Sequence, residues 1–71
     1  MHKRTFKVLK TNDKVTNWDR GEWNGMCGLV TFTEPEVGMI GIKLDNGKRC
    51  VTPYVMVAMG DNSIKERLSE R

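Results

Sequence analysis

Two tryptophans and an arginine in one short stretch are the side chains best suited to recognising a ligand. Trp18 and Trp23 flank the segment Asp19-Arg20-Gly21-Glu22. Aromatic rings can stack on exposed bases while a neighbouring cation meets a phosphate, so this stretch could bind nucleic acid. The alternative is that one or both rings cover a small hydrophobic core. We expect Trp18 to do so and Trp23 to be exposed.

Basic side chains near the N-terminus could supply phosphate contacts. Residues 1–10 carry four basic side chains and no acidic one, whereas residues 11–71 carry eight basic and nine acidic ones. The excess positive charge therefore lies at the N-terminus, in Lys3, Arg4, Lys7 and Lys10. Such a segment attracts phosphate backbones or acidic partners; the alternative is a solvated end that keeps the protein soluble.

A second group of basic residues surrounds a predicted hairpin. Lys43, Lys48 and Arg49 lie on either side of the turn residues Asn46 and Gly47. They could extend a basic surface beyond the N-terminal segment. The alternative is ordinary solvated charge that Asp45 partly cancels.

The residue types that usually carry catalysis or bind metals are present but not grouped. His2 stands alone, and Cys27 and Cys50 form no CxxC pair and have no neighbouring base in the sequence. No glycine-rich phosphate loop ending in Gly-Lys-Ser/Thr is present. We therefore expect a protein that is not an enzyme and that has no metal and no cofactor.

The apolar runs of the chain are short. None has the length of a secretory signal core or of a membrane helix, for which about 18 apolar residues are needed. We expect a cytoplasmic protein with reduced thiols and no membrane partner.

A chain of 71 residues is long enough for one domain with a thin core. Glycines divide its middle into short runs that alternate like β-strands, and no segment before Gly60 has helical periodicity. We expect a long loop at Trp18–Met26, a turn at Glu34-Pro35-Glu36 and, after the capping residues Asp61-Asn62-Ser63, one or two helical turns over Ile64–Glu70. Extended segments are expected over Thr5–Lys10, Asp13–Asn17, Cys27–Thr33, Met39–Asp45 and Val55–Met59.

The sequence also predicts which side chains share a face. Asn46-Gly47 favours a two-residue type I′ turn, which places Ile42 opposite Val51 and Lys43 opposite Cys50. Val51 then faces the core, and Cys50 faces the other way. In the preceding strand, the alternation places Val30 and Phe32 on one face and Leu29, Thr31 and Thr33 on the other.

The order of glycines and strands resembles the KOW motif and its SH3-like relatives. The chain runs from Asp13 and Val15 through a loop to Gly21, Gly25, Gly28 and Val30, which match the Gly-x3-Gly-x2-Gly-x-Val spacing of that family. The loop is one residue longer before Gly21, and Asn17 stands where a core valine is usual. The resemblance implies a binding module, often one of the transcription or translation machinery, whose contact loop is Trp18–Met26 with Arg20, Trp23 and Asn24 at its tip.

The fold class expected is all-β: a small five-stranded SH3-like barrel with a basic N-terminal arm and a short C-terminal helical turn. Residues 1–10 form the arm or an edge strand, residues 11–60 the KOW-like barrel, and residues 61–71 a short helix or tail. A second resemblance, of Val51-Thr52-Pro53-Tyr54 to a turn of plasmid-type dihydrofolate reductases, lacks the glutamine that this enzyme family uses.

The function expected is binding of DNA or RNA, with transcription or translation control as the process it would serve. The alternative is a protein-interaction module that docks onto a larger machine, such as a polymerase or host factor, through Trp23, Met26 and Met39. Either could act as a monomer or a small homo-oligomer. The candidate nucleic-acid-binding residues are Lys3, Arg4, Lys7, Lys10, Arg20, Trp23, Asn24, Lys48 and Arg49.

Overall fold

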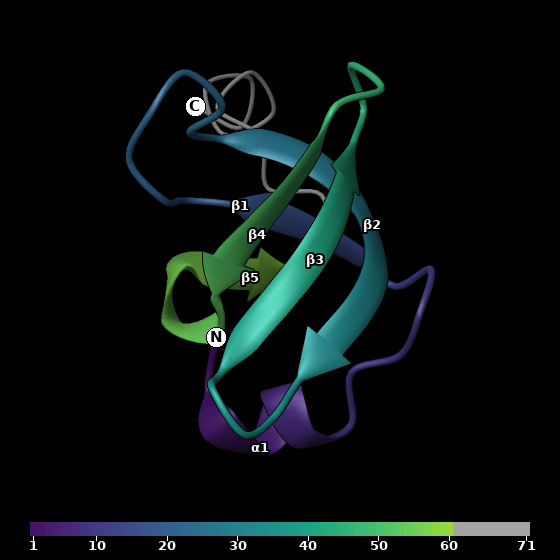
Figure 1. Ribbon diagram of the computed structural model, residues 1–71, viewed down its shortest axis with the longest axis vertical. Coiled ribbons are helices and arrows are strands. Elements are labelled where there is room, and N and C mark those ends of the chain that lie inside the picture. Colours follow the sequence, from purple (N-terminus) through teal and green to yellow (C-terminus); the bar gives the residue numbers. More distant parts are fainter. Residues whose placement is uncertain (61–71) are drawn as a thin grey trace, which may run out of the picture.

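Five strands and two short helices lie within residues 1–60, the part of the chain that this computed structural model describes. The elements are α1 (Lys3–Lys7), β1 (Lys14–Asn17), β2 (Met26–Glu34), β3 (Met39–Leu44), β4 (Arg49–Pro53), the 3-10 helix η1 (Tyr54–Met56) and β5 (Val57–Met59) (Figure 1). The helix expected over Ile64–Glu70, with its cap Asp61-Asn62-Ser63, lies outside the described residues. None of the helices within residues 1–60 has the length and apolar character needed to cross a membrane.

The strands form one antiparallel sheet in the order β4-β3-β2-β1-β5. The long strand β2 pairs with β1 through its first residues and with β3 through its later ones, so the sheet bends around it (Figure 1). The prediction of a small, all-β, five-stranded SH3-like fold is therefore confirmed. Its strands Asp13–Asn17, Cys27–Thr33 and Met39–Asp45 agree with β1, β2 and β3 to within a residue or two at each end.

The sheet is not closed into a barrel, because β4 and β5 do not pair with each other. Pro53 ends β4 without a backbone donor, and η1 then carries the chain away from that edge. Across this open side, the Thr52 hydroxyl of β4 donates to the Asp19 carboxylate, just after β1, at 2.9 Å. The Trp18 N–H donates to the Met56 carbonyl at 2.7 Å and so extends the pairing of β1 with β5 by one residue.

The inner face of the sheet carries the core. Side chains alternate along a strand, so the period-two pattern of β3 turns its apolar residues to one side. Ile40, Ile42 and Leu44 are buried there, and β1, β2 and β5 contribute one buried valine each. The buried residues of this cluster are Phe6, Val15, Val30, Ile40, Ile42, Leu44 and Val57.

The N-terminal segment is a helix where we expected an extended arm or edge strand. α1 begins after His2, whose side chain accepts a hydrogen bond from the Arg4 N–H at 3.2 Å. Its one buried residue, Phe6, stacks on Tyr54 of η1 with ring centroids 4.6 Å apart and ring planes 3° from parallel. Docking of this ring stabilises a helix of five residues, which is too short to be stable alone. Val8, expected on the same face as Phe6, is exposed.

The β3–β4 hairpin has a register one residue away from the expected one. Its loop contains three residues, Asp45 to Gly47, because the Leu44 N–H donates to the Lys48 carbonyl at 2.8 Å. Only Gly47 of the three has a positive φ, 86°, so the turn is not type I′. Ile42 therefore lies opposite Cys50, and Lys43 lies opposite Arg49.

A one-residue slip turns every side chain of a strand to the other face. In β4 this slip places Cys50 on the core side and leaves Val51 exposed on the outer side, the reverse of our expectation. A second shift occurs in β2, where the register changes between Val30 and Phe32. This bulge at Thr31 turns Phe32 outward, so that Phe32 no longer shares a face with Val30.

Candidate nucleic-acid interface

The outer face of the sheet carries a row of basic residues. The register places Lys14 of β1 opposite Leu29 of β2, Leu29 opposite Lys43 of β3, and Lys43 opposite Arg49 of β4. Neighbouring strands are about 4.8 Å apart, so the row crosses four strands over about 14 Å. We call Lys14, Leu29, Lys43 and Arg49 the cationic row.

A second row lies beside the first and is apolar. Phe32 of β2 is opposite Gly41 of β3, and Gly41 is opposite Val51 of β4. Phe32 is 41% exposed and Val51 54% exposed, and Leu29 of the cationic row is 40% exposed. Since two residues along a strand span about 6.5–7 Å, the two rows run parallel at about that separation. We call Phe32, Gly41 and Val51 the apolar row, and the two rows together the outer face.

Gly41 determines how Phe32 lies on the sheet. A Cβ atom built on Gly41 would collide with the Cδ1, Cε1 and Cζ atoms of the Phe32 ring. The ring therefore occupies the space that a side chain at Gly41 would need. It covers the neighbouring strand and still leaves a large part of its surface to solvent.

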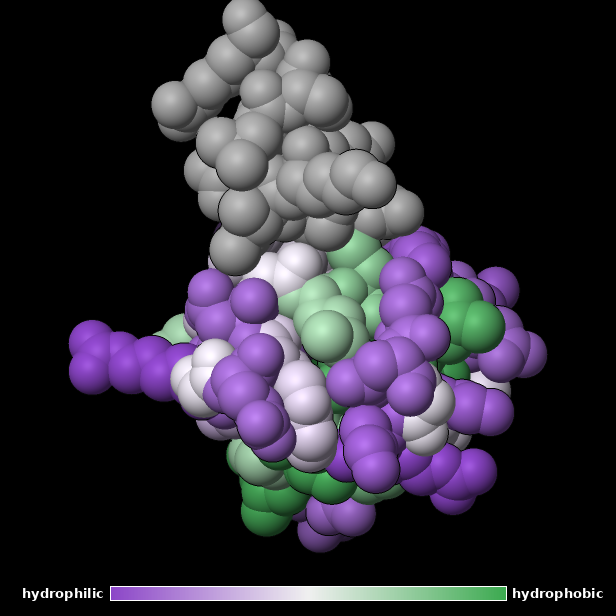
Figure 2. All heavy atoms as spheres, turned by 90° about the horizontal axis from the view of Figure 1, so that it is seen from above, coloured by the Kyte–Doolittle hydropathy of each residue, from purple (hydrophilic) through white to green (hydrophobic). Residues whose placement is uncertain are grey.

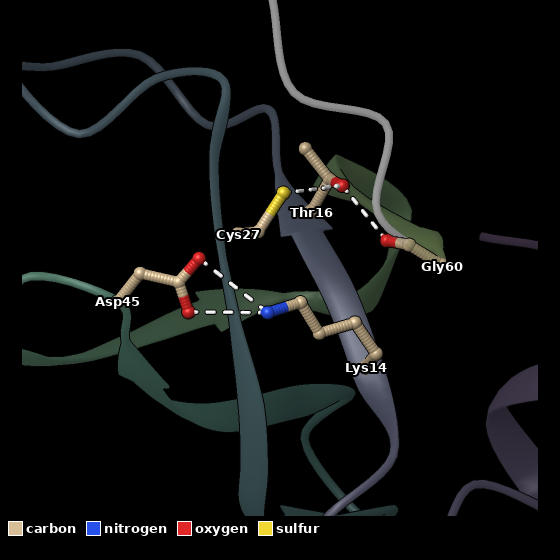
Figure 3. A network of polar contacts seen from close by, with 5 residues as sticks. All are labelled: Lys14, Thr16, Cys27, Asp45 and Gly60. Carbon is tan, nitrogen blue, oxygen red and sulfur yellow. Dashed lines mark hydrogen bonds and ion pairs between the residues drawn. The ribbon is translucent and has the colours of Figure 1, made fainter. Parts of the chain in front are cut away.

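Acidic residues of the described chain balance only one end of the cationic row. The Lys14 ammonium pairs with the Asp45 carboxylate at 3.2 Å, as part of the polar contacts drawn in Figure 3. Lys43 and Arg49 are exposed, and no ion pair joins either of them to another residue within 1–60. Because like charges directly opposite on neighbouring strands repel, the Lys43–Arg49 pair is unfavourable for the folded chain by itself.

The tryptophan loop, residues 18–25, is built differently from our expectation. Trp23 is half-buried and packs against the core cluster rather than standing free at a tip. The Asn24 side-chain amide donates to the carbonyls of Trp18 and Asp19, at 3.0 and 3.2 Å, so it holds the loop together. Arg20 is exposed, and its backbone N–H donates to the Asp19 carboxylate at 2.8 Å.

Asn17 and Asp19 organise this loop, and sequence reasoning did not assign them a role. Asn17 is buried, and its amide donates to the Trp23 carbonyl at 3.3 Å while its oxygen accepts from the Asp19 N–H at 3.0 Å. Asp19 in turn accepts from Thr52 across the open side of the sheet. The feature of the sequence that could have indicated this role is Asn17 itself, a polar residue where the KOW motif usually has a core valine.

The N-terminal basic residues lie at the opposite end of the molecule from the hairpin (Figure 1). Lys3, Arg4, Lys7 and Lys10 are all exposed, on or just after α1. The turn that carries Glu34 and Glu36 belongs to this same end, because the Tyr54 N–H donates to the Gly38 carbonyl at 2.8 Å and Tyr54 stacks on Phe6. The fold therefore separates the two groups of basic residues that the sequence suggested as one surface.

The end of the molecule that carries the hairpin and the tryptophan loop is largely hydrophilic. Seen from that end, most of the coloured surface is hydrophilic, and smaller hydrophobic areas lie near its middle, at the right and at the bottom (Figure 2). The three residues expected to dock a protein partner do not form a patch. Trp23 and Met26 pack against the core cluster, and Met39 pairs with Glu34 at the far end of β2 from Met26.

Neither cysteine forms a disulfide. Cys27 is buried, with its sulfur 3.4 Å from the Thr16 hydroxyl (Figure 3). Burial raises the pKa of the Cys50 thiol above its ordinary value, and the negative charge of Asp19 adds to the rise, so this thiol stays protonated at neutral pH. Within residues 1–60, no three His, Cys, Asp or Glu side chains are grouped so that they could hold a metal ion.

The outer face thus presents exposed basic and exposed apolar side chains in two neighbouring rows on hydrogen-bonded strands. Of its members, the sequence had pointed to Arg49 and, less directly, to Lys43; Lys48 lies next to Arg49 in the hairpin. Leu29, Phe32 and Val51 were not expected there. No protein-family model matches the chain, and comparisons with curated proteins and with solved structures found no match, so a function has to be inferred from this geometry.

Proposed function

We propose that this protein is a non-catalytic module that binds nucleic acid, DNA or RNA, through the outer face of its sheet. The observation that carries the proposal is the pairing of Lys43 with Arg49 in a row of cations, directly beside the exposed apolar residues Phe32 and Val51. A polyanion would relieve the repulsion within the pair, and release of its counterions would favour binding.

The position of these cations on strands favours a defined contact. The backbone of a paired strand is held by its neighbours, so the ammonium and guanidinium groups start from fixed Cα positions. Lysine and arginine also present apolar stems that can lie along Leu29 and Val51. A cytoplasmic role in transcription or translation control is part of this proposal, and the thiols of Cys27 and Cys50, which form no disulfide, are compatible with a reducing compartment.

The test is a binding titration with matched charge variants. Fluorescence anisotropy of labelled DNA and RNA oligonucleotides is measured between about 50 and 200 mM salt, the range in which phosphate contacts change affinity most visibly. The double variant Lys43→Gln/Arg49→Gln removes two charges from the outer face. Its control, Arg4→Gln/Lys7→Gln, removes the same two residue types from α1.

We expect the outer-face variant to lower affinity and to reduce the slope of log K against log salt by about two, one unit for each phosphate that is no longer neutralised. The α1 variant is expected to change the slope less. Equal effects of the two variants, or no saturable binding of any oligonucleotide by the wild-type chain, would contradict the proposal.

A protein-interaction module remains the second candidate, and a different surface favours it. Val8, Val37 and Val55 are exposed around the α1 end, where α1, the turn before Gly38 and η1 meet. Exposed apolar side chains gathered in this way are typical of protein-binding sites. A complex captured from a lysate that survives nuclease and high salt, and that is absent for a Val37→Ser/Val55→Ser variant, would support this candidate.

A further inference from the structure

We infer that the ligand of the outer face is a single-stranded nucleic acid that runs across the strands, with its phosphates along the cationic row and its bases over Phe32 and Val51. This inference rests on the proposed function and specifies the form of nucleic acid and its direction on the sheet. It comes from the arrangement of the two rows.

The two rows match the two sides of a single strand. A single strand has a charged backbone on one side and unpaired bases on the other. The cationic row and the apolar row are parallel where both cross β2, β3 and β4, and on β3 and β4 they are separated by two residues, about 6.5–7 Å. Phosphates placed along Lys43 and Arg49 therefore leave the bases over the neighbouring row, where an aromatic ring is exposed.

Phe32 has the position of a stacking platform. Its ring fills the space above Gly41, and the residue is still 41% exposed. Single-stranded nucleic acids are commonly bound by aromatic rings on a sheet, and the contact tolerates any base because every base has a flat face. Gly41 is the residue that permits this placement, since any larger residue there would displace the ring.

A duplex does not fit these rows equally well. The base edges of a duplex lie at the bottom of its grooves. The major groove is about 8.5 Å deep, and it admits a helix or a two-stranded ribbon. Phe32, Gly41 and Val51 sit on the broad surface of three adjacent strands rather than on a projecting element. A duplex on this face would contact the cationic row and leave the apolar row unused.

The experiment compares ligands and variants of the full chain. The probes are fluorescein-labelled oligothymidylate, oligouridylate and a mixed-sequence DNA duplex of the same length. The variants are Phe32→Leu, which keeps an apolar side chain over Gly41 but removes the aromatic face, and Phe32→Tyr, which keeps the ring. Thermal unfolding of each variant shows that it is folded at the temperature of the titration.

We expect the wild-type chain to bind single strands more tightly than the duplex. Phe32→Leu should weaken single-strand binding by about 5- to 150-fold, the range that removal of one base stack produces, and leave both duplex binding and the salt slope unchanged. Phe32→Tyr should restore wild-type affinity.

The outcomes separate this inference from the proposed function. If the duplex binds as tightly as the single strands, or if Phe32→Leu binds single strands like the wild type, the inference is wrong. The proposed function then still stands, provided that the Lys43→Gln/Arg49→Gln variant binds more weakly than the wild type. If the wild-type chain binds none of the probes, both are wrong.

Discussion

The outer face and the α1 end are both basic and both carry exposed apolar side chains, but the fold supports them in different ways. The outer face belongs to four adjacent strands, and the register fixes the order of its residues. The α1 end is a helix of five residues, and its buried contact is made by Phe6. Residue type alone would rank the two regions equally. Their supports differ in rigidity, and a rigid support lowers the entropy lost when a ligand binds.

The largest effect is expected from the contact that holds the α1 end. Phe6→Ala removes a buried ring that stacks on Tyr54, and it should lower the free energy of unfolding by about 3–5 kcal/mol. Chemical denaturation followed by circular dichroism measures this decrease. Val8→Ala is the control, because Val8 is exposed at the same end and should change stability by less than about 0.5 kcal/mol. Equal decreases for the two variants would show that α1 is not docked through Phe6.

An intermediate effect is expected at the centre of the outer face. Gly41→Ala forces the Phe32 ring away from its neighbour strand, and overpacking of this kind costs about 1–3 kcal/mol. The double variant Phe32→Ala/Gly41→Ala removes the collision, so Gly41→Ala should cost less in that background than in the wild type. Additive effects in this double-mutant cycle would contradict the described position of the ring.

A smaller effect of opposite sign is expected in the cationic row. Lys43→Gln removes one of two like charges that face each other across β3 and β4, and it should raise stability by about 0.2–1 kcal/mol. Lys48, next to the turn of the same hairpin, lies opposite the apolar residue Leu44, so Lys48→Gln should be close to neutral. If this pair of like charges serves binding, Lys43→Gln should be more stable than the wild type and should bind nucleic acid less tightly. A decrease of stability in Lys43→Gln would show that the pair is not repulsive.

The smallest effect tests the register that separates the two sides of β4. The pKa of the Cys50 thiol is raised in the folded state, so the protonated thiol contributes stability that is complete below the ordinary pKa of a cysteine and is lost as the pH rises through the raised value. Comparison of the wild type with Cys50→Ala over this alkaline range should show a steeper decline for the wild type. With the register of a two-residue turn, Cys50 would be outside and exposed, and the two pH profiles would be parallel.

The positions of the strands were predictable because they depend on local patterns. Period two in Met39–Asp45 predicted that Ile40, Ile42 and Leu44 would be buried together, and they are. Turn residues at Pro35 and at Asn46-Gly47 correctly marked where the chain reverses. The helical segment at Lys3–Lys7 was not predicted, because its stability comes from Phe6 on Tyr54, a contact between residues far apart in the chain.

The candidate site was predictable only in its charges. Arg49 and Lys43 could be picked out as basic residues beside a hairpin, but their pairing across the strands could not. Trp23 was expected at an exposed tip, yet its ring packs against the core cluster. The core of so small a domain is thin, and a large apolar side chain from the loop can cover it. Asn17 and Asp19 have a role only once the loop has folded over the open side of the sheet.

The sequence by itself thus determined the all-β class, the placement of the main strands and the apolar residues of β3 that line the core, because these follow from the alternation of neighbouring residues. The tertiary structure decided which side chains face outward together. The bulge at Thr31 and the three-residue turn each shift the register by one residue, and this turns Phe32 and Val51 outward and sets Lys43 opposite Arg49. Such a shift changes little in the local sequence pattern of a strand. It nevertheless moves the side chains that would face the core to the solvent side, and those that would face solvent to the core side.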